Sequence, residues 1–296
     1  MLKISGNTIN DWNLGDDNII KVYRNGALCY QKVTNGTPPT PPTSSEKYKL
    51  TLKSSSVVSA ECDVTSSVTS SEISTQYSGT VASAEIGSCV TSIGDSAFTK
   101  CFYMVSVSIP NSITYIGDSA FRTCYSLSSV TIPSGVTSVN GYTFASCRSL
   151  RSVTIPDTVT SIGTYAFYEC TGLTSVTIPD SVTSIASSTF YKCKSLTSIT
   201  IPDSVTSLGD YAFYRCSGLT SVTIGSGITN IDYWSFNDCS ALTSVTIYAT
   251  TPPTLGSSVF ENTNDCPIYV PAASVSTYQS ANNWKTYASR IQAIST

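Results

Sequence analysis

The stretch LTSVTIPDSVTSIASSTFYKC, residues 173–193, is followed after two further residues by LTSITIPDSVTSLGDYAFYRC, residues 196–216. The starts at Leu173 and Leu196 set a 23-residue period. The same interval separates seven phenylalanines, each followed three places later by a cysteine: Phe98, Phe121, Phe144, Phe167, Phe190, Phe213 and Phe236. A fixed period of this length indicates one small unit stacked on copies of itself, because a single unit cannot bury its own apolar face. The sequence therefore predicts a solenoid.

Each unit contains two apolar segments joined by a turn. The pattern Leu-x-x-Val-x-Ile, as at Leu219, Val222 and Ile224, is typical of a short strand that sends its apolar side chains inward. Proline follows this strand in five units and ends it, because proline has a fixed φ and no N–H. A second apolar pair, such as Val205 with Leu208, forms another inward-facing edge.

The rest of the unit leads the chain to the next strand. An Ala-Phe pair is expected in one short helical turn, with the phenylalanine in the core. Glycine follows the second apolar pair at Gly94, Gly117, Gly163 and Gly209, which indicates a left-handed backbone at this position. Ala186 replaces it in one unit, so we expect that coil to depart locally from its neighbours.

The period also sets the domain organisation. In-register strands are expected from residues 81, 104, 127, 150, 173, 196, 219, 242 and 265, which makes nine rungs. Residues 81–247 form the repeats, residues 47–80 a leading cap, and residues 248–296 the last rung and a C-terminal cap. The leading cap is expected to contain a strand around Leu50 and a capping box from Thr69 to Glu72. The helical spacing of Val275, Tyr278, Trp284, Tyr287 and Ile291 predicts that they cover the last rung.

The unit LxxVxIPxxVTxIGxxAFxxC resembles the leucine-rich repeats of the BspA-like family over about residues 81–247. The resemblance implies a leucine-rich-repeat solenoid, a β-rich α/β fold with a parallel sheet on one side and short helical turns on the other. Members of this family are surface proteins of gut and oral bacteria and of some mucosal parasites, and their roles are mostly adhesion and binding. The family is defined by its architecture, so the ligand does not follow from it.

Residues 1–33 are predicted to form a separate small β module. Within it, residues 19–32, IIKVYRNGALCYQK, have a hairpin pattern in which Asn25-Gly26 forms a type I′ turn. Residues 34–46 contain four prolines and predict an extended linker. A module too small for a core of its own is expected to dock on a partner or to self-associate. The module also resembles leading segments of structural proteins of phages that infect Bacteroides-type gut bacteria, including crAss-like phages.

Composition excludes several classes of protein. The net charge is −3 and only 12% of residues are charged, so no basic face exists for nucleic acid. No apolar stretch is long enough to insert in a membrane. The first thirty residues lack the apolar core and cleavage site of a secretory signal, so either a signal was removed or the protein reaches its place without one. The initiating Met1 favours the second interpretation.

The cysteines are interpreted as apolar filler. Seven of the eleven occupy equivalent positions just after the core phenylalanine, and seven cannot all pair, so we expect reduced thiols. Cys62 and Cys89 could form a bridge in the leading cap. No metal site is expected, because the chain has no histidine and no C-x-x-C pair.

No catalytic residues are predicted either, and no cofactor. Without histidine the usual general base is missing, although a glycosidase needs only two carboxylates. Asp157, Asp180 and Asp203 follow Ile-Pro in consecutive units, but Asn or Ser takes their place elsewhere, which is typical of a turn position.

Two surfaces are candidates for binding. The outward positions of the strands carry a regular array of hydroxyl groups, which either stabilises the sheet or contacts glycans: Ser129, Thr131, Ser152, Thr154, Ser175, Thr177, Ser198, Thr200, Ser221, Thr223, Ser244 and Thr246. Aromatic residues flank the core phenylalanine on the opposite, convex side, and they either seal the coil surface or bind sugar or protein: Tyr142, Tyr165, Tyr168, Tyr191, Tyr211, Tyr214 and Trp234.

These observations predict a non-enzymatic attachment module in which the N-terminal module anchors a leucine-rich-repeat rod. We expect a virion protein, made in the host cytoplasm, that presents the rod to a protein or glycan on a host-cell or mucosal surface. A secreted or cell-surface bacterial adhesin of the BspA-like type is the alternative.

Overall fold

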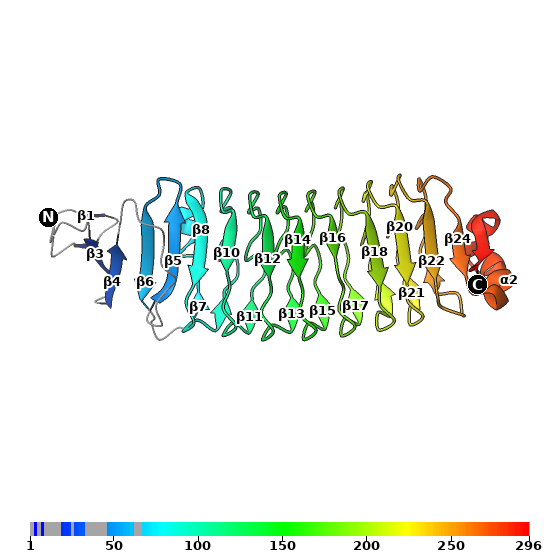
Figure 1. Ribbon diagram of the computed structural model, residues 1–296, viewed down its shortest axis with the longest axis horizontal. Coiled ribbons are helices and arrows are strands. Elements are labelled where there is room, and N and C mark those ends of the chain that lie inside the picture. Colours follow the sequence, from blue (N-terminus) through cyan, green and yellow to red (C-terminus); the bar gives the residue numbers. More distant parts are fainter. Residues whose placement is uncertain are drawn as a thin grey trace.

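The computed structural model describes residues 46–61 and 67–295, together with the strand segments 3–4, 7–8, 19–24 and 27–32. Side chains are described for residues 46–60 and 67–295. The described coils stack along one axis, from β6 and β5 at one end to α2 at the other (Figure 1). The solenoid predicted from the 23-residue period is confirmed, as is the parallel sheet that the resemblance to leucine-rich repeats implies.

One strand per coil forms the main parallel sheet. Equivalent residues of neighbouring repeats pair, for example Ser152 with Ser175 and Val222 with Val245, so the predicted register is confirmed. The strands are β8 Val81–Ile86, β10 Ser106–Ser108, β12 Ser129–Thr131, β14 Ser152–Thr154, β16 Ser175–Val176, β18 Ser198–Ile201, β20 Ser221–Ile224, β22 Ser244–Ile247, β24 Ile268–Val270 and β25 Ile291–Ala293. The hydrogen-bonded ladder has breaks between β10 and β12 and between β16 and β18.

The last of these strands was not predicted. β25 pairs with β24 in the same register, Ile268 opposite Ile291, so a tenth rung ends the sheet. The helical spacing assigned to Ile291 was therefore wrong. Its side chain is buried as the apolar residue of a strand, and the preceding helical segment ends at Arg290.

A second parallel sheet follows the second apolar pair of each coil. Its two-residue strands point an isoleucine, leucine or valine into the core and leave the preceding residue at the surface. They are β7 Ser67–Val68, β9 Ser92–Ile93, β11 Tyr115–Ile116, β13 Ser138–Val139, β15 Ser161–Ile162, β17 Ser184–Ile185, β19 Ser207–Leu208, β21 Asn230–Ile231 and β23 Thr254–Leu255. The two sheets enclose the core from two sides.

The third side of each coil consists of turns, and the prediction of a helical turn at Ala-Phe was wrong. Two residues per coil, two places before and two places after the core phenylalanine, have a left-handed backbone, for example Tyr165 (φ 59°) and Glu169 (φ 54°). Every second N–H group in this turn points out of its own coil and donates to a carbonyl of the next coil. Tyr165 N donates to Ser187 O at 3.1 Å, and Glu169 N donates to Tyr191 O at 2.8 Å. These bonds between coils stabilise a conformation that non-glycine residues otherwise disfavour.

The recurring glycine of the unit has a steric cause. None of Gly94, Gly117, Gly163 and Gly209 has a left-handed backbone, contrary to the prediction. A Cβ on Gly163 would instead lie 2.9 Å from the carbonyl carbon of Asn140 in the preceding coil, and one on Gly209 would lie 2.6 Å from the nitrogen of Ser187. Glycine therefore permits close approach of adjacent coils.

Ala186 does not mark an irregular coil, contrary to the prediction. Its N–H donates to Ile162 O at 3.2 Å, as that of Gly163 does to Val139 O at 2.7 Å. The irregular coil is instead the one that contains Asn140, whose side-chain Nδ2 donates to Ile116 O at 2.6 Å. There the second sheet is interrupted, between β11 and β13.

Stacked phenylalanines form the axis of the core. Adjacent rings are nearly parallel, with centroids 5.1–5.6 Å apart from Phe98 to Phe260, so an eighth ring extends the predicted seven. All seven ladder cysteines are free and buried, which confirms the reduced thiols. They are more than filler, because the Cys170 thiol donates to Phe144 O in the preceding coil at 3.1 Å. Five other ladder thiols make the equivalent hydrogen bond.

The leading cap is an antiparallel extension of the main sheet. Strand β5, Glu46–Leu52, pairs with both β6, Val57–Glu61, and β8. Glu72 accepts from the Thr69 N–H at 2.7 Å, which is one half of the predicted capping box, but α1, Ser74–Tyr77, begins later, with Ile73 at its N-cap and no side-chain cap. The same carboxylate pairs with the buried Lys47 at 2.8 Å. Cys89 is disulfide-bonded, and the predicted partner Cys62 lies outside the described residues.

The C-terminal cap covers the last coil. It contains η1 Ala272–Ser274, α2 Val275–Ser280 and η2 Trp284–Arg290. Trp284 and Tyr278 are fully buried and donate to Pro253 O and Ala249 O at 2.8 and 2.9 Å. Tyr287 Oη accepts from the Phe260 N–H at 3.2 Å, where the next coil would supply a carbonyl. Tyr278, Trp284 and Tyr287 thus cover the last rung as predicted.

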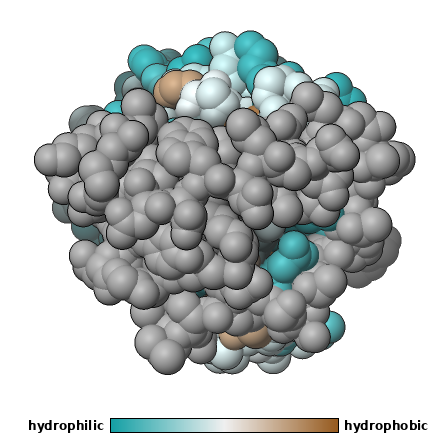
Figure 2. Space-filling view, turned by 90° about the vertical axis from the view of Figure 1, so that its left-hand side faces the viewer, coloured by the Kyte–Doolittle hydropathy of each residue, from teal (hydrophilic) through white to brown (hydrophobic). Residues whose placement is uncertain are grey.

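The N-terminal module contains the predicted hairpin, in which β3 Ile19–Arg24 pairs antiparallel with β4 Ala27–Lys32. Short strands β1 Lys3–Ile4 and β2 Asn7–Thr8 also pair antiparallel. The Asn25-Gly26 turn and most of the proline-rich linker lie outside the described residues. In Figure 2, the described surface visible around this end is mainly hydrophilic or intermediate. Among the helices of the described chain, none has the length and apolar character required to cross a bilayer.

Candidate functional site

The main sheet presents the predicted hydroxyl array to solvent. In β12 and β14, serine and threonine are exposed on both sides of a buried valine. In β20 and β22 the equivalent residues are half-buried. Side chains alternate between the two faces along each strand, and equivalent residues pair between strands. The hydroxyl groups therefore form rows across the sheet.

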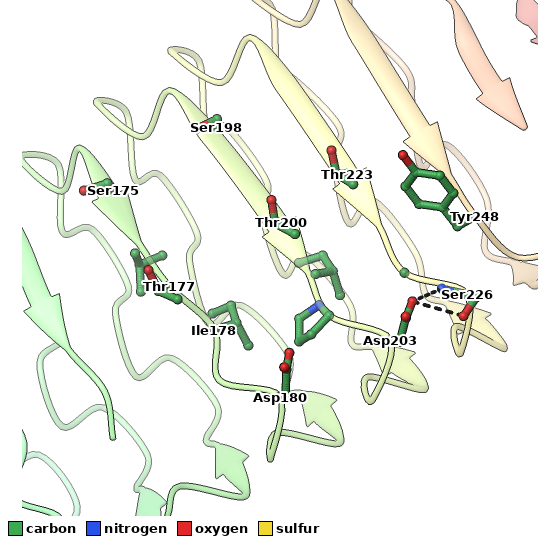
Figure 3. Close-up of a pocket in the computed structure, with 14 residues that line it drawn as sticks. Ser175, Thr177, Ile178, Asp180, Ser198, Thr200, Asp203, Thr223, Ser226 and Tyr248 are labelled. Atoms are coloured by element: carbon green, nitrogen blue, oxygen red, sulfur yellow. Dashed lines mark hydrogen bonds between the residues drawn. The ribbon is translucent and has the colours of Figure 1, made fainter. Parts of the chain in front are cut away.

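A groove of about 930 Å³ lies on this face over β16, β18 and β20, and we call it the sheet-face groove. In Figure 3, Thr200 and Thr223 project from the strands, the Tyr248 ring lies at one end, and Asp180 and Asp203 lie along the edge where the strands end. Tyr248 is exposed. The groove coincides with the break in the ladder between β16 and β18.

The two carboxylates in the groove differ in their contacts. Asp203 Oδ1 accepts from the Ser226 N–H at 2.6 Å and from Ser226 Oγ at 3.0 Å, so it links one turn to the next (Figure 3). Gly225 makes room for this contact, because a Cβ there would lie 2.6 Å from the same oxygen. Asp180 is exposed at the edge of the groove. Asp203 thus has the turn role expected of these aspartates.

The predicted aromatic residues form two rows on the turn side. The first tyrosine row, two places before the core phenylalanine, contains the stacked pair Tyr142–Tyr165 (4.6 Å between centroids) and the edge contact Tyr211–Trp234 (4.9 Å). The second tyrosine row, one place after the phenylalanine, joins Tyr168 to Tyr191 at 4.9 Å and Tyr191 to Tyr214 at 5.0 Å.

Edge contacts join the two rows within a coil. The rings of Tyr165 and Tyr168 lie 5.5 Å apart at 72°, and those of Tyr211 and Tyr214 lie 5.5 Å apart at 80°. Such perpendicular contacts are favourable because the ring edge is positive and the face negative. The seven predicted residues therefore form one connected aromatic surface.

A cavity of about 620 Å³ opens in this surface, and we call it the aromatic pocket. Its lining contains five of the predicted site residues, Tyr142, Tyr165, Tyr168, Tyr191 and Tyr211. Tyr214 and Trp234 lie outside it and pack against the rings of Tyr191 and Tyr211. Ser188 also lines the pocket and was not predicted. The sequence contained a signal for this residue. Position 188 is equivalent to Tyr165 and Tyr211 in the neighbouring repeats, but it carries a serine.

Charged groups beside the pocket are mostly paired. Glu169 lies 3.0 Å from Lys192 and 3.6 Å from Arg148. Partial burial raises the pKa of Glu169, but the hydrogen bond and charge of Lys192 outweigh it and hold this pKa below its usual range. Burial and the Glu169 charge raise the pKa of Tyr168, so its phenol is neutral at pH 7 and can donate a hydrogen bond.

The described chain also bears on metal and thiol chemistry. Among its residues, no group of three or more acidic or cysteine side chains is arranged to hold a metal ion. Burial raises the pKa of the Cys101 and Cys216 thiols to about 12 and that of the other ladder thiols as well. The thiolate form that metals and electrophiles require is therefore scarce at neutral pH.

Comparison with known proteins agrees with the repeat geometry. The profile of the BspA type leucine rich repeat region matches residues 71–173 and 160–283, in six copies. Among curated proteins, none matches the chain.

Several solved structures are similar. A leucine rich repeat protein of Treponema pallidum is 24% identical, with 63% of this chain and 78% of that chain covered and a TM-score of 0.45. A leucine rich cell surface protein of Faecalibacterium prausnitzii is 28% identical, with 70% of each chain covered and a TM-score of 0.33. The pneumococcal vaccine antigen PcpA is 17% identical, with 72% and 67% covered and a TM-score of 0.48. Since the profile matches most of the sequence, the chain belongs to the BspA type leucine-rich repeat proteins.

Proposed function

We propose that this chain is a non-enzymatic binding module that attaches to a protein or glycan on a cell or mucosal surface. The observation that carries the proposal is the aromatic surface on the turn side. Half-exposed tyrosines offer both apolar faces and hydrogen-bonding edges, the combination that recognition surfaces favour. Stacking within a rigid solenoid fixes these rings before a ligand arrives, which reduces the entropy lost on binding.

Membership in the BspA type family supports a surface-binding role and fits a bacterial cell-surface adhesin. A virion protein is the second candidate, supported by the resemblance of residues 1–33 to phage structural proteins. In that case the N-terminal module docks on a particle component or self-associates, and the linker separates the rod from the docking surface. The two candidates share one ligand-binding rod and differ in what carries it.

Binding can be tested with fluorescently labelled full-length protein on gut bacterial cells and on mucin-coated plates. We expect saturable binding that falls at least about tenfold when Tyr168, Tyr191 and Tyr214 are all replaced by serine, since each lost stacking contact costs about 0.5–1.5 kcal/mol. Tyr248→Ser in the sheet-face groove is the matched control and is expected to bind normally. Loss of binding in the control alone would assign recognition to the sheet face, and absence of binding to every surface would overturn the proposal.

The carrier can be identified by mass spectrometry. Peptides of this chain in purified phage particles would support the virion protein, whereas release of the same peptides by protease shaving of intact bacteria would support the adhesin. Removing residues 1–33 is expected to leave the solenoid folded and to abolish particle association or self-association, as followed by light scattering. A shortened chain that keeps both associations would contradict the docking role.

A further inference from the structure

The first tyrosine row has a gap of one coil. Aromatic rings occupy this row at Tyr142, Tyr165, Tyr211 and Trp234, but the coil between Tyr165 and Tyr211 carries Ser188. The backbone does not cause the gap, because Ser188 has the same left-handed conformation (φ 57°) as Tyr165 (59°) and Tyr211 (60°). Its N–H also donates to the next coil, to Asp210 O at 2.8 Å. Only the ring is missing.

The second tyrosine row shows what fits across these three coils. There the rings of Tyr168, Tyr191 and Tyr214 form a continuous stack with steps of 4.9 and 5.0 Å. Tyr165 and Tyr211 stand two coils apart at the same repeat position, so about two such steps separate them, which is room for one further ring. Both walls are held in place, because Tyr165 contacts Tyr168 edge to face and Tyr211 contacts Tyr214 in the same way.

The floor of the gap is polar. Ser188 lines the aromatic pocket with only 5% of its surface exposed, and its hydroxyl makes no hydrogen bond within the described part of the chain. A purely apolar occupant would remove water from this hydroxyl without replacing the hydrogen bond, which is unfavourable. An occupant with hydroxyl groups along its edge would satisfy it. Tyr191, on the same coil, also lines the pocket and offers a third wall.

We propose that this gap binds a single hexopyranose ring of a neutral glycan, held between the faces of Tyr165 and Tyr211 and hydrogen-bonded to Ser188. A pyranose has two C–H faces that pack on aromatic rings and an equatorial edge of hydroxyl groups, which matches two apolar walls and a polar floor. Arg122, the cation in the pocket lining, packs against Tyr142 beyond the Tyr165 wall and so lies outside the gap. The proposal rests on the proposed binding function and names the ligand class for its aromatic pocket.

Saturation-transfer NMR on the full-length protein tests the proposal with methyl glycosides of glucose, galactose, mannose and N-acetylglucosamine. We expect at least one to bind. Ser188→Tyr completes the row and is expected to abolish that binding, because its ring occupies the gap. Ser119→Tyr is the matched control, since it adds a tyrosine at the same repeat position two coils before Tyr165 and leaves the gap open. Tyr165→Ser removes one wall and is expected to weaken binding about three- to tenfold.

N-Acetyltyrosine amide serves as the aromatic probe. If it binds wild type and is displaced by none of the glycosides, the gap receives an aromatic side chain and the sugar proposal is overturned. Unchanged glycoside binding in Ser188→Tyr would also overturn it, provided thermal melting shows a folded variant. Cell or mucin binding that persists in Ser188→Tyr would leave the proposed function intact while the sugar site fails.

Discussion

The buried phenylalanine column and the first tyrosine row use the same coil spacing but differ in continuity. Phenylalanine rings stack without interruption from Phe98 to Phe260, whereas the tyrosine row stops at Ser188 and resumes at Tyr211. In the coil of Ser188 the core is regular, with Phe190 lying 5.3 Å from Phe167 and 5.1 Å from Phe213. Folding therefore requires the phenylalanine column but not an aromatic residue at each position of the first tyrosine row. The serine at position 188 is thus not explained by the packing of the core.

The largest expected effect is a loss of folding stability at alkaline pH, which should come from the buried core and not from the tyrosine rows. Burial raises the pKa of the seven ladder thiols in the folded state, while unfolded thiols ionise near pH 8.5–9. Folded thiols hold their protons more tightly, so their contribution to stability is complete below about pH 8.5 and is lost as the pH rises through the folded-state pKa, which is about 12 for Cys101 and Cys216. We therefore expect the free energy of unfolding to fall steadily as the pH rises from about 8.5 to 10, because all seven thiols lose stabilisation in the same pH range.

Urea unfolding at pH 7.5, 9 and 10 measures this loss. Serine at both Cys170 and Cys193 should reduce the drop in stability between pH 7.5 and 10, because two of the seven titrating thiols are removed, whereas serine at Tyr168 and Tyr191 should leave most of the drop. The buried phenols Tyr278 and Tyr287, whose pKa burial also raises, add to the same slope. Equal stability at pH 7.5 and 10 would show that the thiols are not sealed from solvent.

Removal of one ring from the column should cost more than removal of its surface neighbour. Phe190→Ala is expected to destabilise the solenoid by about 3–5 kcal/mol, because it empties a fully buried aromatic site. Tyr191→Ala, one residue further, removes a half-exposed stacked ring and should cost about 1 kcal/mol. Urea midpoints of the two variants give the comparison, and similar values would contradict the assigned division between column and row.

A smaller effect tests the thiol as a hydrogen-bond donor. Cys170→Ala should cost about 1–3 kcal/mol, because it leaves a small cavity and removes the thiol donor to Phe144 O. Cys170→Ser keeps a donor and should be no worse than alanine. The adjacent half-exposed Thr171→Ala is the control and should lie within about 0.5 kcal/mol of wild type. Chemical denaturation curves resolve these differences. If the serine variant is less stable than the alanine variant, the thiol only fills space and its hydrogen bond does not add to stability.

The smallest effect is expected where the row is completed. Ser188→Tyr and Ser119→Tyr should each change stability by less than about 0.5 kcal/mol, since other coils already accommodate tyrosine at this position with the same backbone. Differential scanning calorimetry is sensitive enough to compare them. A large destabilisation by tyrosine at 188 alone would mean that the gap is a requirement of the fold.

The 23-residue period was enough to predict which residues are equivalent, and therefore the solenoid, the register of the main sheet and the inward positions of phenylalanine and cysteine. It did not predict the left-handed backbone at tyrosines such as Tyr165, because bonds to the next coil impose it and tyrosine has no such preference of its own. The role of glycine was misread for the same reason, since the atoms that crowd it belong to the preceding coil. The aromatic residues were identified individually, but the pocket arises from the serine among them.

The backbone hydrogen bonds between the turns that carry the phenylalanines all run in one direction, with donors facing the C-terminal end and acceptors facing the N-terminal end. At one end Ser74 N–H donates to Ala97 O, and at the other the Tyr287 hydroxyl receives the Phe260 N–H. The turns between these ends repeat this donor and acceptor pattern, so insertion or deletion of a whole unit would leave matching groups on both sides. Each event would change the reach of the rod by about 4.8 Å. Length and end chemistry are thus set by separate parts of the chain, the length by the number of units and the end chemistry by the two caps.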